Sequence, residues 1–159
     1  MPSVFPTPDH DHGRCSADTL KHAEALCAKR GERLTAMRRH VLEVLAASHK
    51  PVGAYEIIDA VAARGPRPAP ITIYRALDFL TAQGLVHRIE SRNAFLACIN
   101  NHPSDAPVVF LICEQCGAVG EAPSTAVTDS LNAAAKSAGF APKSRVIEIT
   151  GVCKHCRAG

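Results

Sequence analysis

The chain has no tryptophan, only two tyrosines and an aromatic content of 4% over 159 residues. So few large rings predict small cores that need a metal ion or a partner chain for support. No apolar run approaches the roughly 20 residues that cross a bilayer. The polar, Pro- and His-rich stretch 1–13 has no apolar segment of the kind found in signal peptides. These absences predict a soluble, cytoplasmic protein.

Seven cysteines are present, and four of them form two Cys-x-x-Cys pairs, Cys113/Cys116 and Cys153/Cys156. Two thiols three residues apart can turn toward one ion, and two such pairs make a closed tetrahedral site of the kind that holds structural zinc. Two disulfides or four unrelated thiols are the alternatives. A closed site stabilises a fold without sensing or catalysing, so the function must lie elsewhere.

Residues 1–15 are predicted to form a disordered tail, although the run His10-Asp11-His12 with Cys15 contains metal-ligand types. Nothing nearby in the sequence preorganises these groups, so we favour a solvated tail. Ser16 is then the expected N-cap of a first helix over about 17–30, ended by Gly31.

Three further helices and a hairpin are predicted between Thr35 and Cys98. Thr35 is the expected N-cap of the second helix, a third spans about 54–64, and Pro70 begins a fourth over about 70–83. Extended segments follow at 85–90 and 94–98, separated by a turn. Three helices and a two-stranded hairpin make up a winged helix-turn-helix, which we place at 16–98.

Residues 99–107 form a polar linker, and 108–159 form a second domain. A buried strand at 108–112 runs into the first cysteine pair. Ser124 is the expected N-cap of a helix over about 125–138, and a strand over 144–150 runs into the second pair. The fold class is therefore α+β, with the four-cysteine zinc joining the ends of two strands.

The fourth helix carries the residues that could contact DNA. A recognition helix presents side chains near its N-terminus to base edges. Tyr74 and Arg75 point away from the apolar stripe, and Arg can bond guanine bidentately. Arg67 and Arg38 are candidate phosphate contacts, and Thr72 belongs to the same turn. The net charge of +3 is compatible with nucleic acid without being diagnostic.

The run Thr72-Ile73-Tyr74-Arg75-Ala76-Leu77 and the later Gly84-Leu85-Val86-His87 resemble the recognition helix and wing entry of the ferric uptake regulator family. Ile112-Cys113-Glu114-Gln115-Cys116-Gly117 and the closing cysteine pair complete the resemblance, which covers about residues 18–157. Tyr74 to Leu80 and Cys98 are similar to the zinc uptake branch of the family. The resemblance implies a homodimeric, zinc-loaded repressor that binds operator DNA upstream of zinc-import genes, with 108–159 as its dimerisation domain.

The resemblance also implies a second, regulatory zinc site at the hinge, so that each subunit binds two Zn²⁺ ions. The matching positions are His87, Cys98 and Glu121, with His102 as the expected fourth ligand. His102 lies earlier in the linker than the family's histidine, whose place Ala106 takes. A thiolate, an imidazole and a carboxylate together suit Zn(II) better than iron.

Three other functions remain open. An iron- or peroxide-responsive regulator of the same family would use the same fold, and Cys98 argues against iron. A zinc-binding interaction module without DNA affinity would keep the four-cysteine site. An enzyme is disfavoured, because neither cysteine pair opens a helix in a thioredoxin-like setting and no His-x-Glu precedes a pair as in zinc deaminases.

Overall fold

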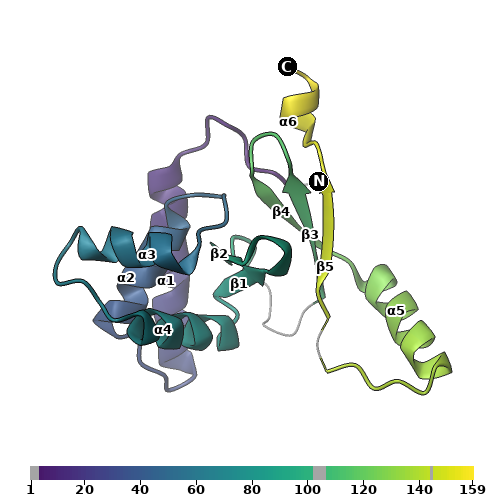
Figure 1. Cartoon of the computed structure of the whole chain (residues 1–159), viewed down its shortest axis with the longest axis horizontal. Coiled ribbons are helices and arrows are strands. Elements are labelled where there is room, and N and C mark those ends of the chain that lie inside the picture. Colours follow the sequence, from purple (N-terminus) through teal and green to yellow (C-terminus); the bar gives the residue numbers. More distant parts are fainter. Residues whose placement is uncertain (1–3, 102–106, 144) are drawn as a thin grey trace.

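Helices dominate the N-terminal half of the chain, and a small sheet dominates the C-terminal half (Figure 1). The computed structural model describes residues 4–101, 107–143 and 145–159. The helices are α1 (His12–Lys29), α2 (Ala36–Ala46), α3 (Ala54–Ala62), α4 (Pro70–Ala82), the 3₁₀ helix η1 (Glu90–Arg92), α5 (Thr125–Ser137) and α6 (Lys154–Arg157). The strands are β1 (Val86–Ile89), β2 (Ala94–Ala97), β3 (Val108–Cys113), β4 (Val119–Pro123) and β5 (Ile147–Gly151).

Local capping explains where several helices begin. The Thr35 side chain accepts a hydrogen bond from the Arg38 backbone N–H, and the Ser124 side chain accepts one from Val127. Pro70 occupies the first turn of α4, where its missing N–H costs nothing. These three predicted starts are confirmed.

The first helix differs from the prediction, because it begins at His12 and not after Ser16. Its N-cap is Asp11, whose carboxylate accepts a hydrogen bond from the backbone N–H of Arg14 at 3.1 Å. Part of the segment predicted as a disordered tail is therefore helical. The capping signal at Ser16 competed with an equally good one at Asp11, and only tertiary contacts distinguish them.

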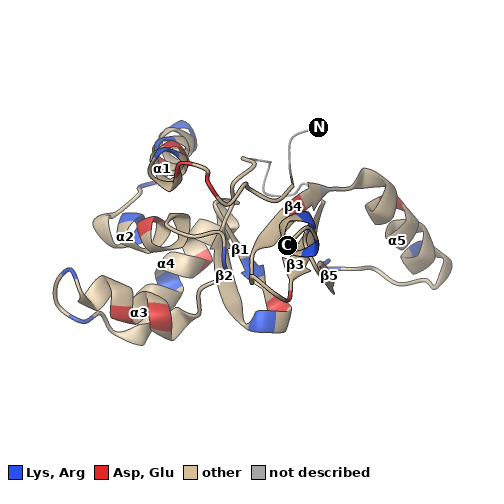
Figure 2. Cartoon of the chain, turned by 90° about the horizontal axis from the view of Figure 1, so that it is seen from above, with Lys and Arg blue, Asp and Glu red and all other residues tan. Residues whose placement is uncertain are grey.

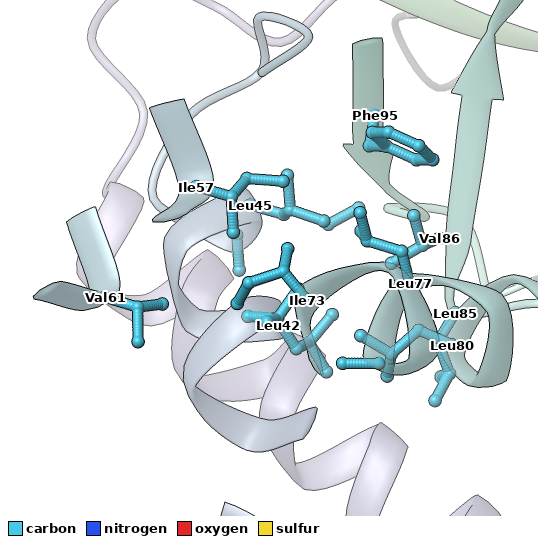
Figure 3. Packing of buried hydrophobic residues seen from close by; sticks show 14 of the residues in the cluster. Leu42, Leu45, Ile57, Val61, Ile73, Leu77, Leu80, Leu85, Val86 and Phe95 are labelled. Carbon is cyan, nitrogen blue, oxygen red and sulfur yellow. The ribbon is translucent and has the colours of Figure 1, made fainter. Parts of the chain in front are cut away.

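Helices α1 to α4 and the β1–β2 hairpin share one core (Figure 3). Its centre consists of fully buried aliphatic side chains from successive helices: Leu42, Leu45, Ile57, Ile73, Leu77 and Leu80. The hairpin closes the core through Val86 and Phe95. This unit is the winged helix expected from the sequence.

The second sheet has the strand order β4-β3-β5, with β4 antiparallel and β5 parallel to β3. Strand β4 and helix α6 were not predicted, and β5 begins at Ile147, later than expected. Helix α5 projects away from α1–α4 beyond this sheet (Figure 1). The α+β fold class is confirmed.

A small second core joins the hairpin to the sheet. Ile89 and Leu96 of the hairpin pack with Phe110, Ile112 and Val119 of the sheet. At the same junction the Glu148 carboxylate accepts hydrogen bonds from the backbone N–H groups of Glu90 at 2.6 Å and Ser91 at 3.1 Å. The wing therefore contacts the sheet both through this core and through these hydrogen bonds. Within the described residues, no helix is both long and apolar enough to cross a membrane.

Candidate functional site

The four cysteines of the two Cys-x-x-Cys pairs converge at one end of the sheet. Their sulfur atoms all lie within 4.8 Å of one another. The Cys113 and Cys156 sulfurs are 3.8 Å apart, and those of Cys116 and Cys153 are 3.9 Å apart. A tetrahedral zinc with Zn–S bonds of about 2.3 Å requires S–S separations of about 3.8 Å. The residues therefore fit a structural zinc ion.

The parallel pairing of β3 and β5 brings the two cysteine pairs together. Cys113 ends β3 directly beside Gly151, the last residue of β5. After Cys113 the chain makes a tight turn, in which Gly117 has a φ of +74° and donates its backbone N–H to the Cys113 carbonyl. Backbone N–H groups of Cys116 and Cys153 lower the pKa of the Cys113 thiol to about 6. They favour the thiolate, the form that binds zinc.

A second cluster consists of His87, Cys98 and Glu121, whose ligand atoms also lie within 4.8 Å of one another. In the hairpin His87 pairs with Leu96, so Cys98 is the diagonal neighbour of His87 on the same face. The backbone N–H of Cys98 donates a hydrogen bond to the Leu85 carbonyl, which continues the pairing of the two hairpin segments beyond β1 and β2. Glu121 comes from β4 of the other sheet, so the cluster draws donors from both halves of the molecule.

Glu121 is 1% exposed, which is unusual for a carboxylate. Its Oε1 lies 3.7 Å from Nε2 of His87, and the Cys98 thiol points at its Oε2 at 3.7 Å. Burial raises the pKa of Glu121 to about 7, although hydrogen bonds from Ile99, Cys98 and Asn100 oppose this shift. A buried acid beside a thiol and an imidazole is an arrangement that a divalent cation would stabilise.

The expected fourth ligand, His102, lies outside the described residues, as does Ala106. The last described residues before that gap do lie beside the cluster. The Asn100 side-chain amide donates a hydrogen bond to the Glu121 backbone carbonyl at 3.3 Å. The linker therefore leaves the hairpin next to β4.

The candidate DNA contacts fall into two groups. Tyr74, 42% exposed, and the exposed Arg75 face solvent from α4, with Thr72 partly buried beside them. Arg67 instead makes a 2.8 Å ion pair with Asp59, and the Arg38 guanidinium stacks 3.5 Å from the centre of the Phe79 ring. Figure 2 shows acidic residues on α3 and basic residues on α2 and α4. The structure leaves Tyr74 and Arg75 available and ties Arg67 and Arg38 to neighbours.

The model of the ferric uptake regulator family matches residues 29–150. The chain belongs to this family. It is 39% identical over 140 residues to the zinc uptake regulation protein of Escherichia coli K12, which covers 87% of this chain and 81% of that protein.

Two solved structures are also similar to this family member. One is a zinc uptake regulator complexed with zinc and DNA, with a TM-score of 0.81, 38% identity, and coverage of 90% of this chain and 95% of that one. The other is holo XcZur, with a TM-score of 0.80, 44% identity, and coverage of 89% and 99%. The apo form of XcZur has a TM-score of only 0.54 at 40% identity, with coverage of 91% and 99%. The overall arrangement of this chain is therefore more similar to that of holo XcZur than to that of apo XcZur.

Proposed function

We propose that the protein is a zinc-responsive transcriptional repressor that binds operator DNA as a zinc-loaded homodimer and controls zinc-uptake genes in the cytoplasm. The observation that carries this proposal is the convergence of His87, Cys98 and Glu121 from the wing and the second sheet. The relatives add support, because the zinc uptake regulator that it resembles at a TM-score of 0.81 is a complex with zinc and DNA. No enzymatic activity is part of the proposal.

The regulatory step follows from where the ligands lie. His87 and Cys98 belong to the winged helix, and Glu121 belongs to the sheet. A shared ion would fix the angle between these units across the hinge, residues 99–107. In a dimer, that angle sets the separation of two recognition helices, which must match half-sites about one helical turn apart. Zinc binding would therefore remove in advance the conformational entropy that DNA binding otherwise costs.

Zinc is the proposed ion in both sites, which gives two ions per subunit. The four-cysteine set, Cys113, Cys116, Cys153 and Cys156, is closed and structural. The regulatory set of Cys98, His87 and Glu121, with His102 as the proposed fourth ligand, combines thiolate, imidazole and carboxylate. Such a set suits zinc, whereas oxygen and imidazole ligands without a thiolate are more typical of iron sensors.

Homodimer formation is supported by apolar surface that a single chain leaves exposed. Helix α5 has no buried residue, and its Val127 and Leu131 are 41% and 45% exposed. Ile149 on the edge strand β5 is 54% exposed. A helix and an edge strand that both expose aliphatic side chains provide the kind of surface that a second copy buries. We propose that the dimerisation domain comprises 108–159 and the DNA-binding domain precedes residue 99.

Operator contact is assigned to the N-terminal part of α4. We propose that Tyr74, Arg75 and Thr72 contact base edges and adjacent phosphates. Arg67 and Arg38 are proposed as phosphate contacts, and each would have to exchange its present partner, Asp59 or Phe79, for the backbone of DNA.

The test is operator binding measured at buffered free zinc, in parallel with Fe(II) and Mn(II). Binding that tightens with zinc and not with the other two metals supports the proposal, and His87→Ala should abolish that tightening. Preferential activation by Fe(II) would indicate the alternative, an iron- or peroxide-responsive regulator. Zinc binding without any DNA affinity would indicate an interaction module.

A further inference from the structure

A third cluster of metal-ligating side chains lies outside both sites described above. The imidazoles of His10, His12 and His49 place one nitrogen each within 4.8 Å of the others. Their ring centres are 4.1, 4.5 and 5.2 Å apart. His10 and His12 flank the start of α1, whereas His49 follows α2, so segments nearly forty residues apart meet here.

The hydrogen bonds around His10 set up its ring for metal binding. Nδ1 of His10 lies 2.8 Å from the Thr7 carbonyl oxygen, which can only accept, so Nδ1 carries the proton. The lone pair is therefore on Nε2, which lies 2.6 Å from Nε2 of His49. A ring held through Nδ1–H by a backbone carbonyl is the usual support of a metal-bound histidine. Asp11 is occupied as the cap of α1 and does not compete.

His49 supplies the buried side of the cluster. It is 8% exposed, and among the described residues its buried Nδ1 has no hydrogen-bond partner. Its other ring nitrogen, Nε2, faces Nε2 of His10, on the side where a shared cation would lie.

The three histidines border a cavity of about 450 Å³ that also reaches Lys50, Cys116 and His155. A metal ion held by three imidazoles on one side could therefore complete its coordination with water from the other. Three protein ligands and one open position form a common zinc arrangement.

The cluster also anchors a segment that crosses between the two halves of the molecule. Residues 4 and 5 lie against β4, where a Cβ on Gly120 would come within 2.7 Å of the Val4 side chain. From there the segment reaches His10 and His12 beside the loop that carries His49. That loop is itself bonded to β4, because the Val119 N–H donates to the His49 carbonyl at 3.2 Å.

We propose that His10, His12 and His49 form a third site for a divalent cation of the zinc class, whose occupancy fixes residues 4–12 across the junction of the winged helix and the sheet. The site is separate from the four-cysteine cluster and from the His87–Cys98–Glu121 cluster. It gives the N-terminal segment a metal-dependent position that neither of the other sites supplies.

The first test counts metal ions in the full-length protein by equilibrium dialysis against buffered Zn²⁺ and elemental analysis. His10→Gln/His12→Gln should bind one equivalent less per chain than the wild type, and His49→Gln should lose the same equivalent. The control His22→Gln/His40→Gln alters two histidines outside the three clusters and should retain it. Equal metal content in the wild type and His10→Gln/His12→Gln would overturn the proposal. If a folded His49→Gln protein retained the equivalent, the proposal would also be overturned, because His10 and His12 would then bind the ion without His49.

A second test distinguishes this site from the proposed regulatory one. In Cys98→Ser, amide hydrogen exchange over residues 4–12 should still slow on addition of Zn²⁺, even though operator binding no longer responds. In His10→Gln/His12→Gln the exchange should not slow, while operator binding keeps its zinc dependence. Exchange over 4–12 that ignores Zn²⁺ in both the wild type and Cys98→Ser would contradict the proposed fixing of the segment.

Discussion

The four-cysteine cluster and the His87–Cys98–Glu121 cluster differ in where their ligands come from. All four cysteines belong to one small domain, at the ends of two paired strands. The second cluster takes two ligands from the hairpin and one from β4 of the sheet. An ion in the first cluster would stabilise a single folded unit, whereas an ion in the second would add a link between the winged helix and the sheet.

The two clusters also differ in how readily their side chains take the charged form that binds a cation. Backbone N–H groups favour the thiolate of Cys113, so the first site is prepared for its ion. The second site contains a carboxyl group whose pKa is raised to about 7, chiefly by burial. Without a cation, the ionised form of this buried carboxyl group is energetically unfavourable, and a bound cation would stabilise it. The comparison therefore supports the proposal that the first cluster stabilises the fold and the second responds to zinc.

The largest expected effect comes from the first cluster. Cys113→Ser should release its ion and unfold the sheet, because structural zinc contributes on the order of 10 kcal/mol in zinc-finger peptides. The helical signal of α1–α4 should persist, since these helices have their own core. Circular dichroism, metal content and size-exclusion chromatography would test this. The control is Cys15→Ser, and retention of the sheet and of the dimer in Cys113→Ser would contradict a structural role.

Glu121→Gln should change stability in a pH-dependent way. The folded-state pKa of about 7 lies above the ordinary value of 4.5, so between these values the folded chain binds more protons than the unfolded chain. Stability of the protein without its exchangeable ion should therefore fall as pH rises from about 4.5 to 7. Glu121→Gln removes this loss and should be more stable at pH 8, by on the order of 1–3 kcal/mol.

Urea unfolding at pH 5 and pH 8 would measure this effect, in protein that keeps the four-cysteine ion. The gain should be small at pH 5, and Glu32→Gln, which alters an exposed carboxylate, should show no gain at either pH. The same Glu121→Gln variant should lose its zinc response. A variant that is less stable than the wild type at pH 8 would refute the role given to the buried carboxylate.

Substitutions of the candidate DNA contacts should change operator affinity without changing its dependence on zinc. Arg75→Ala should weaken operator binding by about 1–3 kcal/mol. The factor should be the same with and without zinc, because Arg75 touches neither metal cluster. Arg67→Ala should cost less, since its guanidinium is already paired with Asp59 in the free protein. Fluorescence anisotropy with labelled operator measures both variants, and a loss confined to the zinc-loaded form would contradict this expectation.

The smallest expected effect concerns the contact between the wing and β5. Glu148→Gln should weaken the two hydrogen bonds that hold η1 on the sheet. The ratio of operator affinities with and without zinc should fall by roughly 2- to 10-fold, equivalent to about 0.5–1.5 kcal/mol. Asp129→Asn, an exposed change on α5, is the matched control. An unchanged ratio would show that this contact plays no part in the response.

Local signals in the sequence predicted most of the fold. Thr35, Pro70 and Ser124 act through backbone chemistry that depends on a few neighbouring residues, so the helices they begin could be predicted. Strand β4 could not, because its glycine and glutamate have low strand propensity and its pairing with β3 supplies the stability. The burial of Glu121 follows from that pairing and has no local signature.

The third cluster shows the same limit. The His10-Asp11-His12 run is visible in the sequence, but a solvated tail is the favoured interpretation because nothing nearby in the sequence preorganises these groups. His49 completes the set only through the packing of the loop after α2 against β4 and the N-terminal segment. Ligand sets within one motif, such as the two cysteine pairs, can be predicted from spacing. Ligand sets assembled from separate segments can be predicted only from the fold or from a resemblance to a known family.

The most direct test of the central claim is operator affinity for the wild type and Cys98→Ser, each measured with buffered zinc and with the exchangeable ion removed. The wild type should bind roughly 5- to 150-fold more tightly with zinc, which corresponds to a coupling of about 1–3 kcal/mol. Cys98→Ser should remain a folded dimer and bind equally weakly in both conditions. Equal affinity of the wild type with and without the exchangeable ion, or an undiminished zinc response in Cys98→Ser, would contradict the account.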